Sequence, residues 1–250
     1  MNDILLLGAA AALAFGSAFA ARASWINRKI SALRQPPRNV FAAANAALPG
    51  KGPRRRVALI GDSRISQWPQ DSWREAWEIV NRGIGGETAA QMAQRFQSDA
   101  LALKPEAIVI ESGINDLVAA SLMPPAETGA VVRRTAEALI QVVEAGVASG
   151  AVVCVATIVP PARPEILRLP VWRKSLRALV AELNSNLRSR RWPARVVVVD
   201  FSRILGANDD RTLPQAYSAD AFHLNQVAYR RLARAVESTL NDSFATDAMR

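Results

Sequence analysis

From Val57 onward, short apolar runs rich in β-branched residues alternate with longer stretches of helical pattern. Strands that are buried on both faces appear as continuous apolar runs, whereas helices are longer and keep a polar face. Strands are predicted at residues 57–60, 79–81, 107–111, 152–159 and 196–201, and helices at residues 88–103, 127–148, 171–190 and 225–241. Because alternating strands and helices are joined by crossovers, they form a parallel sheet. The sequence therefore predicts one domain, residues 55–244, built as a three-layer α/β/α sandwich with a five-stranded parallel sheet.

An uncharged apolar run at residues 4–21 precedes this domain. It has the minimal length of a membrane span, and Trp25 follows it in the place of an interfacial anchor. Residues 18–20 and 21–23 also offer the small-x-small pattern at which a signal peptide is cleaved. Because no Lys or Arg precedes the run, we expect residues 1–22 to be an uncleaved single-pass membrane anchor. The alternative is a cleaved signal segment and an exported protein.

The net charge of +9 is concentrated at the N-terminal end of the chain. Residues 1–56 hold nine Lys or Arg side chains against one acidic residue, whereas the remainder carries 22 basic and 21 acidic side chains. A basic segment beside an apolar run suits anionic lipid headgroups, and no stripe of Lys and Arg crosses the domain as a nucleic-acid site would need. We therefore expect a membrane contact and no nucleic acid binding.

Residues 23–54 are rich in Pro, Ala and basic side chains, a composition typical of a tether. A chain that begins near Arg54 is accordingly expected to stay active. The whole sequence holds one cysteine, Cys154, and one histidine, His223. These counts exclude an intramolecular disulfide and argue against a zinc site, so we expect no metal and no cofactor.

Four polar segments follow the predicted strands or precede the last predicted helix. They are Gly61-Asp62-Ser63, Asn81-Arg82-Gly83-Ile84-Gly85-Gly86-Glu87-Thr88, Gly113-Ile114-Asn115-Asp116 and Asp220-Ala221-Phe222-His223. Each of them alone is typical of a turn or a helix cap, and a lone histidine is more often structural than catalytic. The carboxyl ends of parallel strands meet at one edge of the sheet, where ligands bind. Together the segments therefore supply complementary parts of one site.

A serine becomes a nucleophile beside a base, and that base needs an acceptor on its other ring nitrogen. Asp220 lies three residues before His223, so its carboxylate can reach Nδ1 while Nε2 faces Ser63. The N–H groups of a glycine turn and an asparagine amide are donors that an oxyanion requires. The four segments thus predict acyl transfer through a serine.

In this order, the four segments resemble the blocks of the SGNH (GDSL-like) hydrolases. Residues 81–116 are similar to the branch that contains the α-subunits of platelet-activating-factor acetylhydrolase and related bacterial esterases. The resemblance covers about residues 55–240 and implies the flavodoxin-like SGNH hydrolase fold. Two features depart from the family pattern: Arg64 stands where an aliphatic residue is usual, and the last block lacks its frequent glycine and proline.

The resemblance implies a role for five residues. Ser63 is the nucleophile, and Asp220 and His223 complete the catalytic triad. The oxyanion hole is implied to consist of the N–H groups of Ser63 and Gly86 and the side-chain amide of Asn115. No metal and no cofactor belong to this mechanism.

The expected function is hydrolysis of a carboxylic ester, with a small-molecule, glycan or lipid ester as substrate. The segments at residues 117–125 and 160–169, expected to line the site, mix apolar residues with Arg163 and Arg168. This mixture favours a short acyl group on a polar or anionic carrier. One alternative is an acyltransferase that uses the same triad to O-acylate a sugar or another alcohol. Another is an inactive, membrane-tethered binding module.

Overall fold

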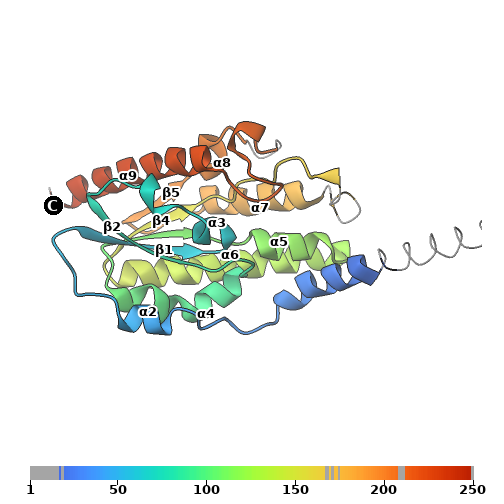
Figure 1. The fold of residues 1–250 in the computed structure, drawn as a ribbon, viewed down its shortest axis with the longest axis horizontal. Coiled ribbons are helices and arrows are strands. Elements are labelled where there is room, and N and C mark those ends of the chain that lie inside the picture. The colour runs from blue at the N-terminus through green and yellow to red at the C-terminus, as the bar shows by residue number, and fades with distance from the viewer. Residues whose placement is uncertain are drawn as a thin grey trace, which may run out of the picture.

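A computed structural model describes residues 17, 20–166, 169, 172–173, 175–207 and 212–248 of the chain. Its single sheet has five parallel strands in the order β2-β1-β3-β4-β5, and helices cover both faces (Figure 1). The strands are β1 (Arg55–Gly61), β2 (Trp77–Gly83), β3 (Ala107–Glu111), β4 (Val152–Ala156) and β5 (Val196–Val199). The predicted three-layer α/β/α sandwich with a five-stranded parallel sheet is confirmed.

Two apolar cores lie on opposite faces of the sheet. One packs against α4, α5, α6 and α7, and the other packs against α3, α8 and α9. The helices are α2 (Ala42–Ala46), α3 (Ser63–Ser66), α4 (Ala89–Asp99), α5 (Ile114–Ser121), α6 (Pro125–Ala148), α7 (Ser175–Ser189), α8 (Phe201–Ile204) and α9 (Gln226–Ala248). Residues 20–32 are also helical, and this N-terminal helix lies beside α5 in Figure 1.

The long helices match the predicted ones, and most differences lie at their ends. Helix α6 starts at Pro125, because a proline in the first turn needs no backbone N–H partner. The apolar run at residues 152–159 is a strand only as far as Ala156. The sequence pattern does not predict helix α5, because this helix begins within the polar segment that contains Asn115. These differences move no predicted site residue away from the sheet edge.

Two positions in the central strands, Gly61 and Cys154, are buried. Gly61 ends β1 in register with Glu111, and a Cβ at this position would lie 1.8 Å from the Glu111 carbonyl oxygen. Glycine is therefore required where the chain leaves β1 for the polar segment. Cys154 is fully buried in β4, and this desolvation raises the pKa of its thiol to about 12.

Residues 35–45, within the predicted tether, make specific polar contacts with the domain. The Asn45 side chain donates to the Asp99 carboxylate at 2.7 Å and accepts from Arg82 at the same distance. Gln91 donates to the carbonyl of Gln35 at 3.1 Å, and Arg38 donates to a carbonyl at the site described below. The composition of residues 23–54 predicts a tether, but these contacts hold the segment on the domain. Composition cannot reveal partners that lie so far along the chain.

In the portion of the chain covered by the structure, no helix combines the length and the apolar character needed to cross a membrane. The apolar run at residues 4–21, on which the anchor prediction depends, falls outside the described residues apart from Ser17, Ala20 and Ala21.

Candidate active site

Ser63 begins the short helix α3 directly after β1. The Asp62 carboxylate caps this helix by accepting the Arg64 N–H at 3.1 Å. From the neighbouring strand β2, the Asn81 amide donates to the Ile65 carbonyl at 2.6 Å. Helix α3 is therefore held at both ends, which fixes the position of the Ser63 side chain.

His223 lies in the loop before α9 and faces Ser63. Its Nε2 is 3.1 Å from Ser63 Oγ, and its Nδ1 is 2.7 Å from Asp220 Oδ2. The other oxygen of Asp220 accepts the backbone N–H groups of Phe222 at 2.7 Å and His223 at 2.8 Å. The structure thus brings together the three residues predicted as a triad, which lie up to 160 positions apart.

Asp220 is ionised at neutral pH in this arrangement. Burial alone would raise the pKa of its carboxyl group, but the hydrogen bonds from the His223 ring and from two backbone N–H groups outweigh burial and hold the pKa at about 2. The carboxylate therefore accepts a hydrogen bond from Nδ1–H, which leaves the lone pair of Nε2 for the serine hydroxyl.

The loop that carries His223 is fixed by its neighbours. The Ala219 N–H donates to the His223 carbonyl at 2.9 Å, and Ala162 and Glu165 bond the backbone of Ala221, each at 2.9 Å. Residues 160–166 thus support this loop. The sequence predicts this segment as a wall of the site, but none of its described residues lines the pocket at Ser63. Instead, the segment contacts Ala221, in the loop that carries His223.

The two further predicted donors lie on adjacent elements. Gly86 occupies the third position of a turn closed by the Glu87 N–H and the Ile84 carbonyl, and its φ of +80° is one that glycine adopts readily. Arg38 donates to the carbonyl of Gly85 in the same turn. Asn115 lies in the first turn of α5 and donates one amide N–H to the Glu87 carbonyl at 3.0 Å. An amide has a second N–H, which leaves a donor for a ligand.

Ser63, Gly86, Asn115 and His223 line one pocket of about 340 Å³. The other residues that line it are Trp25, Lys29, Gln67, Gly85, Ile114, Val118 and Phe222. A hollow of about 300 Å³ shares part of this lining and is bordered by Trp25, Arg28, Lys29, Ala32, Gly86 and Asn115. The N-terminal helix therefore forms one wall of the site. No sequence pattern indicates this wall, because Trp25 alone looks like a membrane-interface residue.

Two carboxyl groups next to the site, those of Glu111 and Asp116, are buried. Burial, followed by repulsion from Asp62, raises the pKa of Glu111 to about 8, and burial raises the pKa of Asp116 to about 7. Asp116 also accepts the Ala89 N–H at 3.0 Å, which ties α5 to the start of α4. Within the described parts of the chain, no three His, Cys, Asp or Glu side chains are grouped as a metal site would need.

These raised pKa values predict how stability depends on pH. The folded protein keeps protons on Glu111 and Asp116 that the unfolded chain releases above its own, lower pKa values, so the free energy of unfolding should fall as the pH rises from about 5 to 8. Urea unfolding at a series of pH values measures this slope. Glu111→Gln and Asp116→Asn should each flatten it, and an unchanged slope in both variants would contradict the assignment.

Comparisons with solved structures agree with the fold. The chain has the fold of a Bacteroides fragilis NCTC 9343 protein assigned as an acylhydrolase, with 24% identity over 82% of this chain and 95% of that chain and a TM-score of 0.68. A Streptococcus pneumonia protein described as a platelet activating factor is 18% identical over 90% of this chain and 99% of its own, with a TM-score of 0.62. The acetyl xylan esterase AlAXEase is 16% identical over 74% and 98% of the two chains, with a TM-score of 0.52.

No curated protein sequence matches the chain. The model of the GDSL-like lipase/acylhydrolase family, by contrast, matches residues 50–231, a range that holds all five predicted site residues. This match covers most of the chain and agrees with the fold. The chain accordingly belongs to the GDSL-like lipase/acylhydrolase family and is a carboxylic ester hydrolase.

Proposed function

We propose that this protein is a serine esterase that removes a short acyl group from a polar carrier. The observation that carries the proposal is the hydrogen-bonded series from Asp220 through His223 to Ser63, with distances of 2.7 and 3.1 Å, at the wall of a pocket. A serine hydroxyl on a neutral imidazole that is itself oriented by a carboxylate is the arrangement that acyl transfer needs.

In the proposed mechanism, Ser63 Oγ attacks the ester carbonyl carbon while His223 Nε2 takes the hydroxyl proton. The resulting oxyanion accepts hydrogen bonds from the N–H groups of Ser63 and Gly86 and from the Asn115 amide. The imidazolium, stabilised by Asp220, then gives its proton to the leaving alcohol as the carbon–oxygen bond breaks. Water, deprotonated by His223, finally releases the acid from the serine.

The walls of the pocket support the substrate class. The pocket of about 340 Å³ has an apolar side formed by Ile114, Val118 and Phe222, which suits a small acyl chain. The adjoining hollow is bordered by Arg28 and Lys29, whose charges favour a polar or anionic alcohol portion. Trp25 lies between the two regions, because it lines both of them.

A fluorophosphonate probe tests the proposed nucleophile. The full chain should be labelled at Ser63, as read by peptide mass spectrometry, and should hydrolyse p-nitrophenyl acetate. An absence of both labelling and turnover would favour the inactive binding module. Formation of an acylated product from an added sugar, faster than hydrolysis, would favour the acyltransferase.

The N-terminal wall leads to a prediction that reverses the expectation from composition. Replacing both Trp25 and Lys29 by alanine should raise KM for a charged ester about 10-fold and change kcat little, because these side chains line the pocket but belong neither to the triad nor to the oxyanion hole. A chain starting at Arg54 should lose this binding and also stability, since the Asn45 and Gln91 contacts disappear with it.

The matched control is a chain that starts at Ser17. It keeps the N-terminal helix, so its KM and melting temperature should equal those of the full chain. An Arg54 chain with unchanged KM and unchanged melting temperature would contradict this prediction and support the interpretation of the segment as a tether.

For residues 4–21, we propose an uncleaved membrane anchor on the evidence of the sequence. The full chain should sediment with membranes and resist extraction by 1 M salt. At this concentration the screening length is roughly 3 Å, so salt weakens a contact between basic side chains and lipid headgroups but not the insertion of an apolar segment. Release by salt would leave only an electrostatic contact. A mature N-terminus near Ala21 or Ser24 would instead show a cleaved signal.

A further inference from the structure

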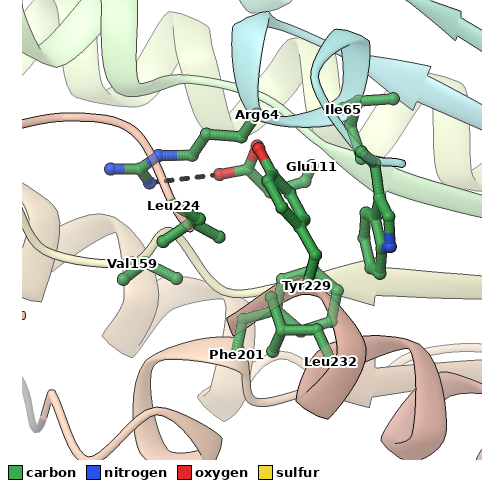
Figure 2. A pocket seen from close by; sticks show the side chains of 9 residues that line it. Arg64, Ile65, Glu111, Val159, Phe201, Leu224, Tyr229 and Leu232 are labelled. Carbon is green, nitrogen blue, oxygen red and sulfur yellow. Dashed lines mark hydrogen bonds and ion pairs between the residues drawn. The ribbon is translucent and has the colours of Figure 1, made fainter. Parts of the chain in front are cut away.

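The residue after the nucleophile, Arg64, is a buried cation with only 2% of its surface exposed. Its guanidinium donates a hydrogen bond to the Glu111 carboxyl group at 3.3 Å, and its Nε donates to the carbonyl of Phe222 at 2.9 Å. Figure 2 shows the guanidinium and the Glu111 carboxyl group facing each other beside Tyr229, in the interior under α3. Arg64 thereby joins the end of β1, the end of β3 and the loop that carries the histidine.

The contact with Phe222 holds the peptide unit that leads directly into His223. The N–H of this unit donates to Asp220 at 2.8 Å, while its carbonyl accepts from Arg64 at 2.9 Å. A peptide unit is planar, so fixing both of its polar ends fixes its orientation. That orientation sets the direction in which the His223 side chain leaves the backbone.

Arg64 lies outside the pocket that contains the nucleophile. The described residues that line the active-site pocket include Ser63 but not Arg64, which instead borders a separate small cavity of about 10 Å³ together with Glu111 and Tyr229. A buried guanidinium carries a desolvation cost that its partners only partly offset. An aliphatic residue at this position would avoid the cost but could not donate to Phe222.

We propose that Arg64 is a positioning residue, which rests on Glu111 and holds the Phe222–His223 peptide so that Nε2 stays within bonding distance of Ser63 Oγ. This inference rests on the proposed function, in which His223 is the base. It assigns a purpose to the one residue beside the nucleophile that departs from the family pattern.

Substitution of Arg64 tests the role through kcat. A misplacement of about 1 Å at reacting groups can cost roughly 10²-fold in rate. Arg64→Met should therefore lower kcat for p-nitrophenyl acetate about 10–100-fold, with KM within about twofold of the value for the unsubstituted protein. Arg64→Lys keeps a charge beside Glu111, but a single compact ammonium cannot reach both partners as the planar fork does, so kcat should fall here as well.

Arg56→Met is the matched control. Like Arg64 it is a buried arginine, 4% exposed, and it pairs with Glu78 at 2.8 Å, but it lies near the start of β1, at the far end of the strand from Ser63. Both Met variants should melt at lower temperature, and only the Arg64 variant should lose kcat. The double variant Arg64→Met with Glu111→Met removes the buried cation together with its buried carboxyl partner, so it should recover stability without recovering kcat.

Three results would overturn the proposal: full kcat in Arg64→Lys, a kcat in the double variant that recovers together with stability, or a change confined to KM. The Lys variant keeps the charge balance and serves where the Met variant does not fold. Substantial turnover by Ser63→Ala would defeat the proposed function itself. Normal dependence on Ser63 with an unchanged kcat in Arg64→Lys would defeat only the role of Arg64.

Discussion

Ser63→Ala and His223→Ala should each lower kcat for ester hydrolysis by at least about 10³-fold, or about 4 kcal/mol of transition-state stabilisation. The serine oxygen forms the acyl bond, and the chain holds no second histidine that could replace the base. Steady-state kinetics with p-nitrophenyl acetate measure the loss, and circular dichroism checks that the fold is kept.

Ser66→Ala is the control for this experiment, because Ser66 lies on the same short helix but is exposed. It should keep essentially full activity. Substantial turnover by His223→Ala would contradict the triad, whatever the serine variant does. Asp220→Asn should also slow the reaction, since the amide no longer carries the charge that stabilises the imidazolium.

Asn115→Ala should lower kcat about 10²–10³-fold with a smaller effect on KM. The negative charge on the oxygen develops as the tetrahedral intermediate forms, so a donor directed at it acts more strongly there than on the ground-state carbonyl. The Glu87 carbonyl holds the Asn115 amide in place at 3.0 Å, so the donor is oriented before substrate binds.

Gln67→Ala is the matched control for Asn115, because Gln67 contributes another amide to the same pocket. Its kcat should change by less than about threefold, an effect typical of uniform binding. If Asn115→Ala raised KM and left kcat unchanged, the amide would belong to substrate binding and not to the oxyanion hole.

The fold could be predicted because its strands are nearly continuous apolar runs. β3 and β4 are buried along their whole length, so every position in them must be apolar or paired, and the run is visible without any partner. The site residues could be predicted for a related reason. Ser63, Gly86 and Asn115 follow three neighbouring strands, and in a parallel sheet those ends converge.

The remaining features depend on contacts between distant parts of the chain. Arg64 meets Glu111 47 positions later and Phe222 158 positions later, and no local pattern connects them. Trp25 and Lys29 reach the pocket only because Arg38, Gln91 and Asn45 dock the N-terminal segment on the domain. A Pro- and Ala-rich stretch has the same composition whether it is docked on the domain or free in solution. Composition alone therefore could not reveal these contacts.

The burial of Cys154 offers a practical route to observing the active-site mouth. Its thiol is the only one in the chain, is fully enclosed in β4 and has a pKa raised to about 12, so thiol-directed dyes have no reactive target in the folded protein. A single cysteine introduced at Ala32, which borders the outer hollow, would then be the sole labelling position. A fluorophore there would report ligand entry and any movement of the N-terminal helix, without the need to remove a native thiol first.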